Sequence, residues 1–360
     1  MERARTVVTI IVGVLLVAGC EDPPVSETIA GAIPQRIVSL APSLTETLFA
    51  LGAGGRVVGV TRYCAYPSAA RDLPKIGGHL DPNFEAIVSL EPDLVVAIPS
   101  SHENRRRLES LGVAVLEVDQ HDVDAVLDSV STVAEACGVR ERGAALRKAI
   151  EDRLADVAAT VAGAPRVRTL VVVGHQIGGG TVRSVWAAGP DTFYDGVLRI
   201  AGGVNVVDGG VARYPEVSRE GLTALDPEVV LDLVAGVEER HLDLDEVRSG
   251  WRRLSELRAV REHRVIVLEG DQMVVPGPRL PEMVEAVARA LHPELACDFH
   301  QLSSRGRRGA VPSGVFDLRG AESYLTVRRA PRSEKTPLGA VHRRPQQNAG
   351  ENRGLEWDAE

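Results

Sequence analysis

The residue types that carry enzyme chemistry are present in this sequence, but not at the spacings that catalysis usually requires. No G-x-S-x-G, H-E-x-x-H or G-x-x-x-x-G-K-[ST] motif occurs, and residues 178–180, three glycines, lack the lysine and hydroxyl that follow a phosphate-binding loop. The nine histidines are dispersed, so no close set of His, Asp and Glu predicts a transition-metal centre. An exported enzyme therefore stays an alternative that no motif supports.

The cysteines in the body of the chain also form no metal or redox pattern. Cys64, Cys137 and Cys297 are far apart, and none belongs to a C-x-x-C pair. The sequence allows one disulfide among them and specifies none.

One stretch that carries acidic residues occurs nearly twice. Residues 83–97, NFEAIVSLEPDLVVA, are followed 135 residues later by residues 218–232, SREGLTALDPEVVLD. In both copies a short helix is expected to end at a turn that contains proline, and then to lead into a buried strand. Glu85 and Glu220 occupy the same position in the two copies. The repeat favours two pseudo-symmetric lobes over the chance recurrence of a common helix-turn-strand unit.

The segments around these copies alternate between short apolar runs and amphipathic stretches, which is typical of α/β folds. The runs RIVSL, VVGVT, DLVVA and VAVLEV, from Arg36 onward, are expected as strands, with helices between them. Ser43 and Glu46 have the spacing of a capping box, which predicts a helix start. After a long helical stretch the alternation resumes with TLVVVG, EVVLDLV and HRVIVLE.

The long stretch between the two blocks predicts a single helix. Its apolar residues recur at steps of three and four, which places them on one helical face, and Gly163 and Pro165 are natural terminators. A helix of about 22 residues is about 33 Å long at 1.5 Å per residue. The predicted fold class is therefore α/β, with two α/β lobes joined by one long rigid helix. The apolar stripe consists of Leu146, Ile150, Leu154, Val157 and Val161.

The beginning of the chain has the composition of an export signal. Arg3 and Arg5 precede an apolar run from Val7 to Val17, which is shorter than the roughly 20 residues that span a bilayer. The sequence VAGC that ends at Cys20 resembles the lipobox of bacterial lipoproteins, so Cys20 is expected to be acylated. The alternative is an ordinary signal peptide with an incidental cysteine.

The end of the chain differs from its body as well. Residues 299–360 lose apolar periodicity and are rich in arginine, which predicts a disordered tail. Residues 21–298 carry 42 acidic and 28 basic side chains, a balance that disfavours nucleic acid as a partner. The predicted organisation is a lipoprotein signal peptide over 1–20, a linker over 21–35, lobes over 36–139 and 164–298, a connecting helix over 140–163 and the tail over 299–360.

The order of these segments resembles the periplasmic binding proteins of ABC importers that carry cobalamin, ferric siderophores and haem. The resemblance covers roughly residues 36–295. The Y-x-x-Y-P after the second strand and the aromatic-P-x-V-S-R-E of the second lobe are most similar to the cobalamin-binding branch. The family fold implies that the ligand is held between the lobes, with little hinge closure. The matching segments are RIVSLAPSLTETLFALG, VVGVTRYCAYP, LPKIGG, NFEAIVSLEPDLVVA, GGVNVV, YPEVSREGLTALDPEVV and RVIVLEGD.

The resemblance also implies which residues meet the ligand. The family's aromatic residue after the second strand falls on Tyr63, and its second-lobe aromatic before P-x-V-S-R-E falls on Tyr214. Trp186 and Asp271 match a further aromatic position and an aspartate near the ligand's amides. A large, flat macrocycle with polar edges suits rigid aromatic faces and a few polar groups. Each of these side chains could instead simply cover an edge of the core.

Three positions depart from the cobalamin pattern. His79 stands where that branch tends to have tryptophan, while Ile98 and Val275 replace a tryptophan and an arginine. The imidazole of His79 could bind iron or cobalt as an axial ligand, or it could be an exposed polar group. Haem and a ferric siderophore are therefore the alternatives to cobalamin as the carried ligand.

Glu85 and Glu220 correspond to the family's pair of lobe-tip glutamates, which meet arginines of the permease. Either one alone is explained by the favourable position of an acid at a helix start. An equivalent pair suits the two-fold symmetry of a permease dimer. The resemblance therefore implies a lipid-anchored binding protein, not an enzyme, that captures a corrinoid and delivers it to a permease dimer with its ATPase subunits.

Overall fold

The computed structural model describes residues 32–99, 102–207, 209, 212–235 and 243–300. All of them belong to one unit of the chain, residues 1–324. The expected signal peptide, with Cys20, and residues 301–360 of the expected tail lie outside the described residues. Within the described ranges, no helix has both the length and the apolar character that a membrane crossing needs.

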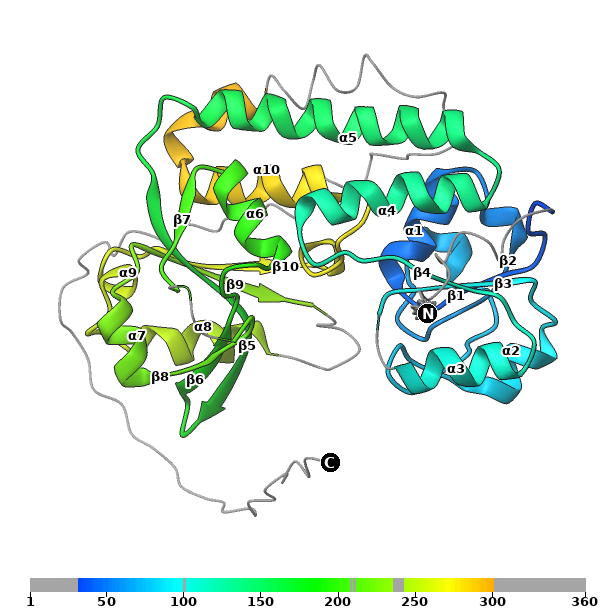
Figure 1. Cartoon of the computed structure of the whole chain (residues 1–360). Helices are drawn as coiled ribbons and strands as arrows, with labels where there is room; N and C mark the ends of the chain where they lie inside the picture. Colours follow the sequence, from blue (N-terminus) through cyan, green and yellow to red (C-terminus); the bar gives the residue numbers. More distant parts are fainter. Residues whose placement is uncertain (1–31, 100–101, 208, 210–211, 236–242, 301–360) are drawn as a thin grey trace, which may run out of the picture. The chain divides into compact units, whose positions relative to one another are not determined.

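The first half of the described chain is a four-stranded parallel sheet with helices on both faces (Figure 1). Its elements are β1 (Ile37–Ser39), α1 (Pro42–Ala50), β2 (Val57–Val60), α2 (Phe84–Ser89), β3 (Leu94–Ala97), α3 (His102–Ser110), β4 (Val115–Glu117) and α4 (Val123–Ala136). The strand order is β2-β1-β3-β4, and all three pairings are parallel. Helices α1 and α4 pack on one face and α2 and α3 on the other, so β3 is buried throughout.

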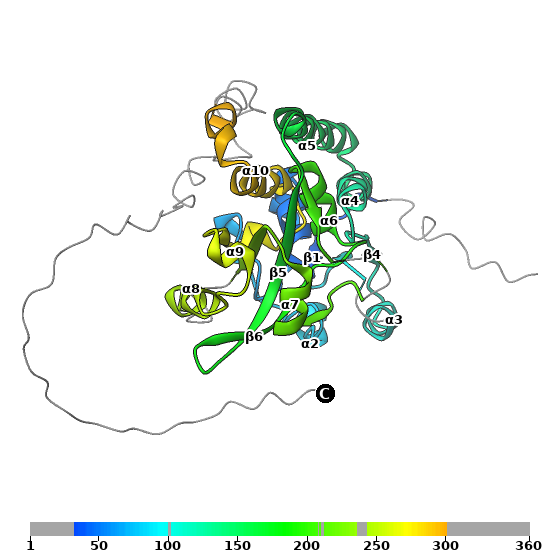
Figure 2. The same cartoon turned by 90° about the vertical axis from the view of Figure 1, so that its left-hand side faces the viewer.

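The second half is built on a six-stranded mixed sheet. Its elements are β5 (Val167–Gly178), β6 (Thr181–Ala187), α6 (Phe193–Ile200), β7 (Gly203–Asn205), β8 (Glu216–Ser218), α7 (Arg219–Leu225), β9 (Val229–Val234), α8 (Leu244–Arg252), α9 (Arg258–Arg261), β10 (Val265–Glu269) and α10 (Leu280–Leu291). Helices α6 and α10 pack on one face, and α7, α8 and α9 pack on the other (Figure 2). Strands β6 and β8 extend the sheet in antiparallel pairings.

The two halves repeat one topology, as the duplicated stretch predicted. Strands β7, β5, β9 and β10 are parallel neighbours in the same order as β2, β1, β3 and β4. The two copies even share a backbone detail, because Glu91 and Asp226 both adopt the left-handed conformation after their helices, with φ of 45° and 42°. The element that was repeated in the sequence is therefore the second helix and the third parallel strand of each half.

A single long helix, α5, links the two halves and packs against elements of both. It runs over Arg140–Val161, 22 residues, close to the predicted 140–163. Helices α4 and α10 lie against it (Figures 1 and 2). Its apolar stripe belongs to one hydrophobic cluster that also includes Ile37 of β1 and Val171 of β5. The two halves therefore share a continuous core. The buried stripe consists of Leu146, Ile150, Leu154, Val157 and Val161.

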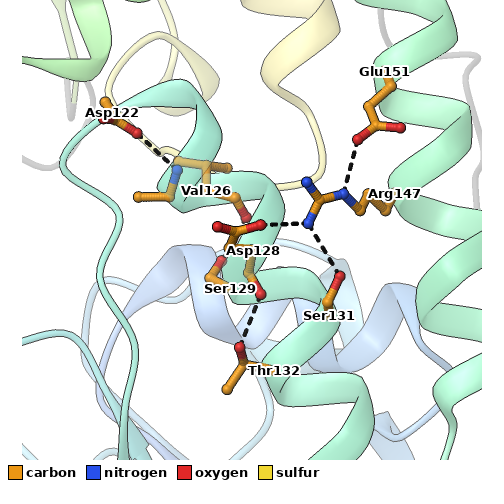
Figure 3. Close-up of polar contacts among 9 residues, drawn as sticks. Asp122, Val126, Asp128, Ser129, Ser131, Thr132, Arg147 and Glu151 are labelled. Carbon is orange, nitrogen blue, oxygen red and sulfur yellow. Dashed lines mark hydrogen bonds and ion pairs between the residues drawn. The ribbon is translucent and has the colours of Figure 1, made fainter.

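Polar contacts add to the packing of α5 on α4. Arg147 of α5 donates to the Asp128 carboxylate at 2.5 Å and to the Ser131 hydroxyl at 3.4 Å, both on α4 (Figure 3). The same guanidinium reaches Glu151, one turn along α5, at 2.8 Å. Because Arg147 is largely shielded and the acids are half exposed, these contacts fix register more than they add stability.

Two sequence predictions are wrong in detail. The capping box does not form, because α1 already begins at Pro42 and the Ser43 hydroxyl donates to the Gln120 side chain at 2.6 Å. The expected tail also begins too early, since Phe299 is fully buried in the shared core. As for the disulfide that the sequence left open, Cys64, Cys137 and Cys297 are all free thiols.

Glu46 has a different partner from the one the capping box assigns. Its carboxylate accepts two hydrogen bonds from Arg279, which precedes α10, and the Nε–Oε2 distance is 2.8 Å. The two side chains are only 3% and 12% exposed, and the guanidinium also lies 4.2 Å from the Tyr66 ring centroid. Burial raises the pKa of Glu46 and the Arg279 hydrogen bonds oppose that rise. Because arginine stays protonated, this is a buried ionic link between the two halves.

We expect Arg279→Met to lower the free energy of unfolding by about 3–5 kcal/mol, because it leaves the Glu46 carboxylate buried without a counter-charge. The double variant Glu46→Leu/Arg279→Met should lose much less, since the Glu46 charge is removed together with its partner. Urea unfolding of the full-length protein measures both. Lys148→Met is the control, because the exposed pair of Lys148 with Asp152 contributes little. An Arg279→Met loss no larger than that of the control would contradict the role of the pair.

Candidate functional site

The two tyrosines predicted to contact the ligand stand on equivalent connections. Tyr63 lies between β2 and α2, and Tyr214 lies between β7 and α7. Strands β2 and β7 occupy the same place in the two parallel sets, so both connections leave the carboxyl end of the same strand of the repeat. The side chains are 61% and 45% exposed, which is high for large aromatic residues. The repeat thus presents one accessible aromatic face from each half.

Charged groups surround Tyr63. The Arg62 guanidinium lies 5.3 Å from its ring centroid and forms an ion pair with Asp81. That pairing, through the hydrogen bond from Arg62, holds the pKa of Asp81 below its usual range. The backbone amide of Arg62 donates to the Gly77 carbonyl at 3.0 Å. The Tyr63 connection is therefore tied by backbone and side chain to the turn over residues 77–82.

This turn also carries His79. Gly77 opens it at φ 91°, where an added Cβ would lie 2.5 Å from the Asp81 carbonyl oxygen, so the close backbone approach requires glycine. His79 is partly buried, and burial lowers its pKa while a hydrogen bond with the Leu40 backbone opposes the shift. The next residue, Leu80, exposes 77% of its side chain. The turn thus presents a neutral imidazole and an apolar side chain close to each other.

Tyr214 is supported by a second aromatic ring. The Tyr194 ring of α6 meets it edge to face, with centroids 6.4 Å apart and an interplanar angle of 84°. Tyr194 is buried in the core. Partial burial raises the pKa of Tyr214, and the positive charge of Arg213 opposes that rise. A small apolar gap lies behind Tyr194, between Val171 and Met283, and it involves none of the predicted ligand residues. It belongs to the core and not to a ligand site.

The other two predicted ligand residues lie elsewhere on the second sheet. Trp186 is partly buried on β6, where its ring covers Gly174 of β5. Asp271 opens a short 3-10 turn directly after β10 and is also partly buried. In the described part of the chain, no ring contact or hydrogen bond joins Trp186 or His79 to either tyrosine. Their ligand roles stay predictions.

The two acids of the repeat occupy matching positions. Glu85 and Glu220 are both the second residue of their helices, and both are exposed. Each helix begins at a side-chain cap, since Asn83 accepts from the Ala86 amide and Ser218 from the Gly221 amide. Hydrogen bonds from its own amide and from Ser218 lower the pKa of Glu220. Both carboxylates are therefore held at equivalent helix starts.

Sequence reasoning missed Arg62, Leu80 and Arg213, which accompany the two tyrosines. A signal for the arginines exists, since the dipeptide Arg-Tyr occurs at 62–63 and again at 213–214. It becomes visible only when the two connections are aligned through the repeat. Among the residues that the structure describes, no cluster of three or more His, Cys, Asp and Glu side chains could hold a metal ion.

Comparison with known proteins agrees with this architecture. A family model described as periplasmic binding protein matches residues 37–271. The chain is 30% identical over 269 residues to the uncharacterized ABC transporter substrate-binding lipoprotein YvrC of Bacillus subtilis, which covers 72% of this chain and 81% of that protein. It is also 30% identical over 268 residues to the cobalamin-binding protein of Halobacterium salinarum, which covers 72% of this chain and 70% of that protein.

A solved structure extends the similarity to the fold. The periplasmic haem-binding protein RhuT from Roseiflexus sp. RS-1, in its apo form, matches with a TM-score of 0.63 and 28% identity, over 72% of this chain and 99% of that chain. The family model covers both sheets, and the relatives are substrate-binding proteins and not enzymes. The chain therefore belongs to the periplasmic binding protein family, as an extracytoplasmic substrate-binding component of an ABC importer of the cobalamin, haem and siderophore class.

Proposed function

We propose that this protein captures a corrinoid between its two lobes and delivers it to an ABC permease. The observation that supports this most is the presence of one exposed tyrosine, Tyr63 or Tyr214, on the equivalent connection of each half. Two rigid aromatic faces offer large apolar contact area to a flat macrocycle at low entropic cost. Trp186 and Asp271 are proposed to contact the macrocycle from the second half. A relative that shares 30% identity is a cobalamin-binding protein.

Haem is the second candidate, and His79 favours it. Burial lowers the pKa of the imidazole and so favours its neutral form at physiological pH. A neutral ring nitrogen is what an axial ligand to iron or cobalt must supply. The similarity to a haem-binding protein of known structure is consistent with this alternative. A ferric siderophore is the remaining ligand of the class.

We further propose that Glu85 and Glu220 dock the protein on its permease. Exposed carboxylates at matched positions of a two-fold repeat suit arginines presented by a permease dimer with its ATPase subunits. Cys20 is proposed to carry the lipid that anchors the protein to the membrane. The lipoprotein relative from Bacillus subtilis supports that anchor.

Absorption titration of the full-length protein with cobalamin, cobinamide and haemin tests the ligand. We expect Tyr63→Ala/Tyr214→Ala to weaken corrinoid binding by a few kcal/mol, because large buried aromatic faces are lost. Leu111→Ala/Val204→Ala is the control, since these side chains are exposed to a similar extent but lie outside the two connections. Unchanged affinity in a folded double variant would remove the tyrosines from the site, and binding of none of the three macrocycles would contradict macrocycle capture.

The neutral state of His79 has a consequence for stability. The pKa of His79 is lower in the folded protein than in the unfolded chain. The contribution of neutral His79 to the free energy of unfolding is therefore fully present above the unfolded pKa of about 6.5, and it is lost as the pH falls through the pKa of the folded protein. We expect the wild type to lose stability more steeply than His79→Gln as the pH falls below about 6.5, and the two curves to run parallel above it. Thermal melts of the ligand-free protein against pH measure this. Parallel curves at all pH values would show that the pKa of His79 is not lowered by folding.

Permease docking is tested with the cognate permease in nanodiscs. Reversing both charges in Glu85→Lys/Glu220→Lys should nearly abolish association, through repulsion from the permease arginines, and leave ligand affinity unchanged. The matched control is Glu141→Lys/Asp245→Lys, because these acids are also the second residues of exposed helix starts. If the double variant docks and supports uptake as well as the wild type does, the two glutamates have no docking role and the repeat reflects only the shared fold of the two halves.

Lipid anchoring is tested by fractionation. We expect Cys20→Ser to move the protein from the membrane fraction to the soluble fraction, since the acylated thiol is removed. A variant with Cys297→Ser keeps the body comparable, because Cys297 is an exposed free thiol. Membrane association that survives Cys20→Ser would show that another segment provides the anchor.

A further inference from the structure

Each exposed tyrosine of the repeat is preceded by an arginine. The pairs are Arg62-Tyr63 after β2 and Arg213-Tyr214 after β7, so one guanidinium accompanies each aromatic face. Both arginines are themselves exposed. Two strongly basic groups beside two accessible apolar faces combine the features that bind a flat ligand with anionic substituents.

Arg62 is held close to the face of Tyr63. Its guanidinium is 5.3 Å from the ring centroid, and its backbone amide is bound to Gly77. The ion pair that it forms with Asp81 is on the surface, with the two side chains 48% and 65% exposed. A surface ion pair of this kind contributes about 0–1 kcal/mol, so exchanging Asp81 for an anion of a ligand costs little.

The backbone of Arg213 is held by a hydrogen bond, and its side chain is exposed. Its carbonyl accepts from the Gly189 amide at 2.7 Å, a close approach that leaves only 3.0 Å for an added Cβ on Gly189. Its charge acts on Tyr214, where it opposes the effect of burial on the pKa of the phenol. Among the described residues, the Arg213 side chain forms no ion pair or hydrogen bond. Its guanidinium is therefore available to an anion.

We propose that Arg62 and Arg213 bind anionic groups, carboxylates or a phosphate, at the edge of the ligand whose faces lie against Tyr63 and Tyr214. The two arginines then select, within the macrocycle class, for ligands that carry such groups. This inference rests on the proposed function, because it assigns the two tyrosines to the ligand. Asp81 acts as the counter-ion that the ligand displaces from Arg62.

The test pairs arginine variants with ligands that carry or lack anionic groups. Full-length wild type and Arg62→Met/Arg213→Met are titrated with haemin and with its uncharged dimethyl ester, and separately with cobalamin and with cobinamide, which lacks the phosphate. In the arm that holds the true ligand, we expect the wild type to prefer the anionic form by about tenfold or more, and the double variant to lose that preference. Loss of the preference in the haemin arm identifies carboxylate as the anion, and loss in the cobalamin arm identifies phosphate.

Two further variants sharpen the result. Asp81→Asn should bind the anionic form more tightly than the wild type does and leave the neutral form unchanged, since it removes a repulsive charge and frees Arg62. Arg106→Met/Arg199→Met is the matched control, with one exposed arginine taken from each half away from the two connections. Arg62→Gln and Arg213→Gln, made singly, replace the double variant if it does not fold.

The outcomes separate this inference from the proposed function. If the double variant keeps the full preference for the anionic form, or loses affinity equally for charged and neutral forms, the charge-selective role is wrong while macrocycle capture stands. If no macrocycle of either charge binds the wild type, the proposed function itself fails. Loss of the preference in the control variant would also overturn the assignment to Arg62 and Arg213.

Discussion

The architecture depends on one shared apolar core that the two halves build together. The inner faces of both sheets, with α1 and α4 from the first half and α6 and α10 from the second, close on the buried stripe of α5. Neither half could bury that face alone, because α5 supplies side chains to both at once. The Glu46–Arg279 pair crosses the same region and requires the two partners to stay in register. Large changes in the relation of the halves would expose this core, which fits a carrier with little hinge motion.

Given that core, the proposed ligand contacts lie at the strand ends. The outer faces of the sheets are covered by separate helices in each half, and the connections at the carboxyl ends of β2 and β7 carry the exposed tyrosines. In open α/β sheets this edge is where ligands commonly bind. The acids proposed for docking lie instead at the starts of α2 and α7. Ligand contact and permease contact are thus assigned to different segments of the same repeat.

Most of the fold could be predicted from the sequence because its elements have strong periodicity. The four strands of the first half and α5 were predicted to within a few residues, and the duplicated stretch predicted the repeat. Strands β7 and β8 are only three residues long, and no strand was predicted over β6, so local pattern did not reveal them. Glu46 was assigned to the wrong partner because Arg279 is 233 residues away. Tyr63 and Tyr214 were found through motifs, whereas the Arg62–Asp81 pair needed three-dimensional contacts.

The antiparallel extension of the second sheet makes the two tyrosines mechanically unequal. The residues on either side of Tyr214 each accept a backbone hydrogen bond. The Ala187 amide donates to the Pro215 carbonyl, and the Gly189 amide donates to the Arg213 carbonyl. Tyr214 therefore lies at the edge of the sheet, beside β6. Tyr63 has no strand beside it among the described residues, and its connection is held mainly through the turn at residues 77–82. Tyr214 is therefore held beside a strand, whereas Tyr63 is held against a turn. In the proposed site, adjustment to ligands of different thickness would fall to the segment that carries Tyr63 and His79.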